Sequence, residues 1–224
     1  MLCWLEIAFQ HLVESEEGHA QVEAAKEEKG EQLANALIRE LSEGMQAMVA
    51  AAIAMDAFSD AVKQAIRFPK ALTTTQRRNR TARYEQVAEV LRRGFRVGNV
   101  GTEQVRAKLK ELYRFRDLAV HPPAEASDPI PYPPIESSVE WRFRAFCSEN
   151  AKAATAVALS LIVQLIERPR DKHPELQRYC RSVSSNIKSV LTDWEARYGK
   201  LIGNQNTSSS GSSAGTIVPA GDES

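Results

Sequence analysis

The feature that most constrains the fold is an apolar segment in the first third of the chain. Residues 45–58, MQAMVAAAIAMDAF, are apolar on nearly every side of a helix, and Asp56 is the lone charged residue among them. A helix that is apolar all round usually lies at the centre of its domain. Apolar residues three or four positions apart continue this phase in both directions. The pattern therefore predicts one long helix that begins at Glu31 and is ended by Pro69.

The other apolar segments follow the same helical spacing. Residues 2–13 place their large apolar side chains on one face. Further amphipathic helices are predicted at residues 84–95, 102–121, 138–167 and 176–198. No stretch alternates with a period of two, which is the pattern of a half-buried strand. The sequence therefore predicts an all-α bundle of five or six helices.

Four segments separate or flank these helices. Residues 14–31 are rich in Glu and Lys and predict a solvated helix or helical linker, and residues 70–82 predict a basic polar connector. Residues 122–137 hold six of the ten prolines and predict a loop. Beyond Gly203 the chain is rich in Ser and Gly and is expected to be disordered. We therefore divide the chain into an acidic helical extension (1–30), a helical bundle (31–202) and a disordered tail (203–224).

Composition and motifs exclude several classes of protein. The three cysteines are far apart and include no CxxC pair, which disfavours a disulfide framework and a zinc cage. The apolar runs at 45–55 and 153–166 are shorter than the ~20 residues that span a bilayer. His11 and His19 lie in acidic helical sequence and are interpreted as solvated surface residues. We therefore expect a reduced, cytoplasmic protein with no membrane contact, no metal and no cofactor.

Charge is strongly segregated along the chain. The 29 basic and 29 acidic residues cancel overall, yet residues 1–62 carry a net charge of −9 and residues 63–116 a net charge of +11. The basic segment could form a phosphate-binding face. It could equally pair with the acidic N-terminal segment, within the chain or across a dimer.

Arg116 lies in the middle of an apolar stripe. On the helix predicted at 102–121, Val105, Leu109 and Leu112 face one direction, and Arg116 falls within about 20° of it. Burial of an isolated guanidinium would cost several kcal/mol, so Arg116 needs an acidic partner, a subunit interface or a ligand-accessible cavity. The structural alternative is a buried ion pair with Asp56.

Asp117 and His121 are four positions apart, so the carboxylate could contact the imidazole and raise its pKa. His121 immediately precedes two prolines, which end the helix there. A histidine at a helix C-terminus also has a purely structural explanation, because its charged form complements the helix dipole.

These residues resemble the signature of the HEPN superfamily (higher eukaryotes and prokaryotes nucleotide-binding). Its members are compact α-helical bundles marked by Arg, four to six residues, then His, and a polar residue commonly follows the Arg. Arg116-Asp117-Leu-Ala-Val-His121 matches that pattern, and the resemblance covers roughly residues 33–167. Arg114 also fits the spacing, but the polar Asp117 favours Arg116.

The resemblance implies a metal-independent endoribonuclease that acts as a homodimer, with one motif from each protomer in a shared cleft. His121 would then transfer a proton, Arg116 would stabilise the phosphorane, and Asp117 would fix the imidazole tautomer. RNA would bind basic residues of the central segment: Arg77, Arg78, Arg80, Arg83, Arg92, Arg93 and Arg96. Many members of the family are toxins or antiviral effectors that are restrained by a partner, so an inhibitor or antitoxin is expected.

Two alternatives stand beside the ribonuclease. The chain could be a catalytically inactive HEPN-like domain that binds RNA, a nucleotide or a protein partner, or a helical interaction module in which the Arg116–Asp56 pair is structural. On an ideal helix Arg116 and His121 are about 140° apart. They can converge only if the backbone unwinds before Pro122 or if a partner subunit completes the site.

Overall fold

The computed structural model describes residues 1–27, 30–123 and 128–201. Helices dominate these residues, and the all-α prediction is confirmed. The elements are α1 (Leu2–Ala25), α2 (Glu31–Ala65), α3 (Lys70–Arg78), α4 (Arg83–Gly94), α5 (Asn99–Val120), β1 (Ile130–Tyr132), a 3-10 turn (Pro133–Ile135), β2 (Ser137–Val139), α6 (Trp141–Ala145), α7 (Ser148–Ile166), α8 (Pro174–Asn186) and α9 (Lys188–Tyr198). The described part of the chain thus has nine α-helices, more than the five or six predicted, because several are short.

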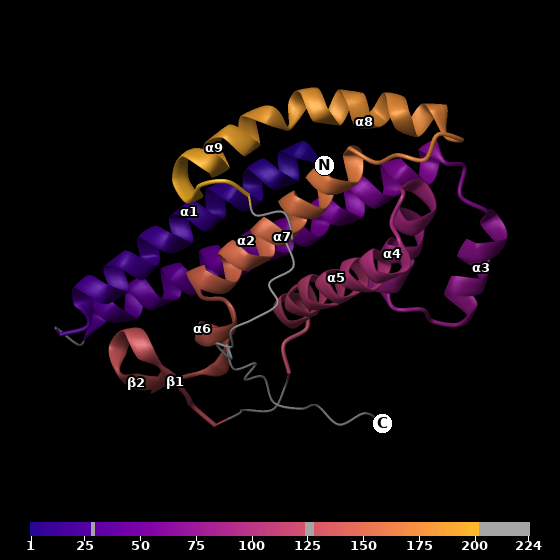
Figure 1. The fold of residues 1–224 in the computed structure, drawn as a ribbon. Coiled ribbons are helices and arrows are strands. Elements are labelled where there is room, and N and C mark those ends of the chain that lie inside the picture. Colours follow the sequence, from indigo (N-terminus) through magenta and orange to yellow (C-terminus); the bar gives the residue numbers. More distant parts are fainter. Residues whose placement is uncertain (28–29, 124–127, 202–224) are drawn as a thin grey trace.

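Helix α2 is the central element of the bundle, as its apolar sequence predicts. It packs against α1, α4, α5 and α7, and Figure 1 shows it running through the middle of these helices. Its fully buried side chains include Met48, Met55 and Phe58. The many alanines between them are also buried, and their small size lets neighbouring helices pack close to α2.

Residues 14–25 differ in part from the sequence prediction, because they continue α1 and pack along α2. Gly18 is buried, and a Cβ atom there would lie 2.8 Å from the backbone nitrogen of Glu40. Gly44 is equally restricted, since a Cβ atom would lie 2.0 Å from the carbonyl oxygen of Phe146. The two glycines therefore permit a close approach of backbones. Residues 14–25 are therefore helical, as predicted, but one face of this helix is buried against α2.

Three further segments depart from the prediction. The connector expected at 70–82 contains α3, a short helix with no buried residue. The helix expected at 138–167 is interrupted: residues 130–139 form an antiparallel hairpin, and Cys147, with extended backbone angles, separates α6 from α7. The helix expected at 176–198 is divided at Ile187. The tail at 203–224, predicted to be disordered, lies outside the described residues.

Two helices, α2 and α7, are long and apolar enough to cross a membrane by length and composition alone. In each, 56% of the apolar window is buried inside the bundle. The core helix of a helical bundle that lies entirely in water is buried in the same way.

Candidate functional site

Asp56, the lone charge in the apolar run of α2, is the centre of a polar cluster. Its Oδ1 atom accepts hydrogen bonds from Arg83 Nε at 2.7 Å and from the Tyr113 hydroxyl at 2.5 Å. Its Oδ2 atom lies 3.4 Å from Arg116 Nη1. Three helices therefore meet at one half-buried carboxylate: α2 supplies Asp56, α4 supplies Arg83, and α5 supplies Tyr113 and Arg116.

Arg116 is fixed by two carboxylates and one aromatic ring. Besides its contact with Asp56, it donates from Nε and Nη2 to Asp117 Oδ1 at 3.0 and 2.7 Å. Its guanidinium lies over the Tyr113 ring, 4.7 Å from the centroid. The side chain stays 24% exposed. The internal ion pair with Asp56, which the sequence offered as the structural alternative, is therefore formed, and it resolves how an arginine fits into an apolar stripe.

His121 lies apart from this cluster. Helix α5 remains helical through Val120, and the backbone N–H of His121 still donates to the carbonyl of Asp117 at 2.7 Å. The helix is therefore intact up to His121, which leaves it with non-helical backbone angles (φ −130°, ψ 68°). Asp117 pairs with Arg116, and no hydrogen bond to the exposed His121 ring is found within the described ranges. The structure brings Arg116 and Asp117 together but leaves His121 separate.

The cluster changes the proton affinity of its members. Burial raises the pKa of Tyr113 far above its usual range, and the charge of Asp56 adds to this effect. Burial acts to lower the pKa of Arg83, but the hydrogen bond and charge of Asp56 outweigh it and raise that pKa overall. Tyr113 is therefore a neutral donor and Arg83 a permanent cation at any physiological pH.

The remaining predicted RNA-binding arginines are spread over two ends of the α3–α4 region. Arg77 and Arg78 lie in the exposed α3, and Arg80 follows it with a left-handed backbone (φ 49°). At the far end of α4, Arg92 and Arg93 pair with Glu89, and Arg96 pairs with Asp171. The alternative motif arginine, Arg114, pairs with Glu111 at 3.3 Å.

Sequence reasoning missed a second polar cluster around Glu40. This carboxylate is only 2% exposed. Its Oε2 atom accepts from the Tyr132 hydroxyl at 2.7 Å, and its Oε1 atom lies 3.0 Å from both the backbone N–H of Ser148 and His19 Nδ1. A signal was present in the sequence, because Glu40 follows Leu33 and Leu37 at helical spacing and so interrupts their apolar stripe.

The two N-terminal histidines also differ from their predicted role as solvated residues. His19 is joined to Glu40, and His11 Nδ1 lies 2.6 Å from Glu43 Oε2. His11, Glu14 and Glu43 place one possible ligand atom each within 4.8 Å of one another, which is a spacing that could hold a metal ion. Both histidines are partly buried between α1 and α2, where their rings contribute to helix packing.

An apolar groove of about 420 Å³ adjoins the C-terminal end of α5, here called the motif end because it carries Arg116, Asp117 and His121. Trp4 and Ile7 of α1, Val49 of α2, and Ala119 and Val120 of α5 line it. Two of these side chains are unusually exposed for their size, Trp4 at 37% and Val120 at 54%. The groove thus includes Val120, the residue that precedes His121 in the chain.

Comparison of the chain with protein-family models, with curated proteins and with solved structures finds no match.

Proposed function

We propose that the chain is a metal-independent endoribonuclease of the HEPN type that acts as a homodimer. The observation that carries the proposal is that the C-terminal end of α5 presents both a fixed, partly exposed Arg116 and an exposed His121. A guanidinium held in one orientation is suited to a phosphate in the transition state, because its forked donors match phosphate oxygens. An exposed imidazole is the side chain that most often transfers protons in catalysis.

The intact end of α5 supports a composite site. On an ideal helix Arg116 and His121 are about 140° apart, so we infer that both residues of one chain do not face the same phosphate. A second copy could supply the missing residue, so that His121 of one protomer meets Arg116 of the partner subunit. The apolar groove with the exposed Trp4 and Val120 offers a surface for that contact. This proposal retains α5 as part of the dimer interface.

In the proposed reaction His121 removes the proton from the ribose 2′-hydroxyl, and the resulting oxygen attacks the adjacent phosphorus. Arg116 stabilises the extra negative charge on the phosphorane. The protonated imidazole of His121 then gives its proton to the leaving 5′-oxygen, and the products are a 2′,3′-cyclic phosphate and a 5′-hydroxyl. Asp117 contacts Arg116 in the structure, so we assign it the role of orienting the guanidinium rather than the imidazole.

One observation favours a second candidate, an RNA-binding domain without catalysis. Arg116 faces two carboxylates, Asp56 and Asp117, and their charges compensate its own. A compensated guanidinium attracts phosphate less strongly than a free one. In this candidate the Asp56 cluster stabilises the helix packing, and RNA is held by the exposed arginines alone.

The deciding experiment incubates the purified protein and its His121→Ala variant with RNA and EDTA. Loss of a general acid–base group lowers a rate by about 10²–10⁴-fold, and we expect a loss in that range for the variant. The cleaved ends should carry cyclic phosphate. Equal cleavage by both proteins would show a contaminating nuclease and end the proposal. Intact RNA that nevertheless shifts in a gel would favour the second candidate.

Two arginine variants separate catalysis from folding. Arg116→Lys should lose activity because an ammonium group cannot reproduce the forked geometry, whereas Arg114→Lys should keep it. The melting temperatures of both variants are measured alongside. If Arg116→Lys only lowers the melting temperature and retains full activity, Arg116 serves structure and not chemistry.

A further inference from the structure

A strongly basic cavity lies at the end of the bundle where α2 and α4 finish and α8 begins. Its volume is about 360 Å³. The cationic and titratable side chains that line it are Arg67, Arg92, Arg93, Arg170, Lys172 and His173. They come from three separate parts of the sequence, and four of them lie outside the arginines that the sequence suggested for RNA binding.

The positive charge of this cavity is largely uncompensated. Among the described residues, Glu89 is the one carboxylate that pairs with a lining cation, at 2.7 Å from Arg92 and 2.5 Å from Arg93. Arg67, Arg170 and Lys172 form no ion pair within the described part of the chain. Five permanent cations against one carboxylate leave a net charge of about +4, and such a concave cationic site attracts anions.

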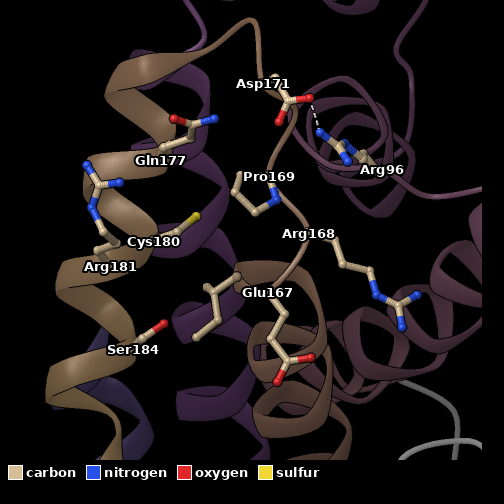
Figure 2. Close-up of a pocket in the computed structure, with 10 residues that line it drawn as sticks. Arg96, Glu167, Arg168, Pro169, Asp171, Gln177, Cys180, Arg181 and Ser184 are labelled. Carbon is tan, nitrogen blue, oxygen red and sulfur yellow. Dashed lines mark hydrogen bonds and ion pairs between the residues drawn. The ribbon is translucent and has the colours of Figure 1, made fainter.

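A neighbouring cavity does not share this excess of positive charge. Figure 2 shows the larger cavity, of about 610 Å³, between α8 and the turn that follows α7. Its lining also includes arginines, but Arg96 is paired with Asp171, and Glu167 lies among the same residues. Charge there is mixed, whereas the described residues that line the cavity at the ends of α2 and α4 include five cations and no carboxylate.

The basic side chains are held in place before any ligand binds. The Arg170 guanidinium donates from Nε to the carbonyl of Phe95 at 3.0 Å and from Nη2 to that of Arg92 at 3.3 Å. Arg67 has a left-handed backbone (φ 50°) and is followed by the buried Phe68. A non-glycine residue in that conformation persists only when its surroundings fix it. The turn that carries Arg67 is therefore a defined part of the cavity wall.

The positive charges around the cavity affect the pKa of His173, which also lines it. Burial lowers the pKa of His173, and the nearby charges of Lys172 and Arg170 lower it further. His173 also precedes the first turn of α8, a helix of 13 residues with no side-chain cap at its N-terminus. The partial positive charge of that helix end adds to the field of the side chains.

We propose that this cavity binds a phosphate group, donated by an RNA backbone or by a nucleotide. The cavity and the Asp56 cluster lie at opposite ends of α4. Arg92 lines the cavity, Arg83 belongs to the cluster, and the two residues are about 14 Å apart along the helix. The cavity therefore acts as a separate contact, and its existence does not depend on cleavage. If RNA is the source, the site anchors the strand away from the motif end of α5.

The test measures binding of inorganic phosphate, of AMP and of a fluorescent 12-nucleotide RNA, the last in a His121→Ala background so that the RNA stays whole. The double variant Arg67→Gln/Lys172→Gln should bind phosphate at least tenfold more weakly. The control Lys110→Gln/Lys188→Gln removes the same charge from exposed positions outside the cavity and should bind as the unmodified chain does. Stronger binding of AMP than of phosphate identifies a nucleotide site, and stronger binding of RNA alone identifies a backbone site.

The His173 ring gives a second readout. A bound phosphate should raise the pKa of His173 from its lowered value, because an anion stabilises the imidazolium against Lys172 and Arg170. Proton NMR of the ring at several pH values measures this shift with and without phosphate. No shift at saturating phosphate, or an equal loss of binding in both double variants, would overturn the proposal. Failure of cleavage alone would leave these measurements unaffected.

Discussion

Replacement of Glu40 by alanine should destabilise the protein severely. The variant leaves the buried Tyr132 hydroxyl and the backbone N–H of Ser148 without their acceptor, and it removes the partner of His19. An unsatisfied buried polar group costs about 1–3 kcal/mol, and this variant leaves two of them. We therefore expect the free energy of unfolding to fall by about 4 kcal/mol. For a chain of this size that corresponds to a melting temperature roughly 10 °C lower.

Thermal denaturation followed by far-ultraviolet circular dichroism measures the effect. Glu40→Gln should cost less than Glu40→Ala, because the amide oxygen still accepts one hydrogen bond. The control is Glu17→Ala, whose carboxylate is 54% exposed and pairs with Arg39 at 2.9 Å. An exposed pair contributes about 0–1 kcal/mol, so this variant should melt almost as the unmodified chain does. If Glu40→Ala is no more destabilising than Glu17→Ala, the carboxylate does not organise this part of the fold.

Three further outcomes follow from the packing. Gly44→Ala should destabilise the bundle by about 2 kcal/mol or more, because its Cβ atom would overlap the carbonyl oxygen of Phe146; urea denaturation checks this. Burial raises the pKa of Cys180 to about 11 and of Tyr179 to about 12. In the folded state both groups stay neutral at pH values where the unfolded chain ionises them. The free energy of unfolding should therefore be fully present below about pH 9 and fall between pH 9 and 12. Urea titrations at pH 8 and pH 10.5 would show this loss. Alkylation at pH 8 should label the exposed Cys3 rapidly and Cys180 only on unfolding, and equal rates would contradict its burial.

The sequence predicted the centre of the fold because local chemistry decides it. A run such as residues 45–58 is apolar on every side of the helix, so it is removed from water only if every side is buried. Helix α2 is accordingly the central helix. The course of residues 14–25 could not be predicted in this way. Their Glu and Lys content indicates exposure, whereas the close packing of α1 on α2 depends on the two positions, Gly18 and Gly44, where backbones approach. A glycine that permits contact looks the same in sequence as one that interrupts a helix.

The candidate site was also predicted only in part. Helical phase placed Arg116 in an apolar stripe, and the isolated charge of Asp56 identified its partner across 60 residues. The contact of Asp117 with His121 was not formed, because Arg116 competes for the same carboxylate at 2.7 Å. Spacing along one helix identifies the residues that can meet, but the strongest available partner decides which of them do.

The segregation of charge along the chain now has a structural explanation, and it places limits on where RNA can bind. Part of the +11 segment meets the acidic N-terminal segment as one interpretation of the sequence suggested, since Arg83 and Arg116 both reach Asp56. Their charge is thereby compensated at the motif end of α5. At the opposite end of α4, Arg67 and Lys172 have no carboxylate partner within the described ranges. Phosphate affinity should therefore concentrate around the cavity at the ends of α2 and α4, while the motif end contributes orientation and proton transfer.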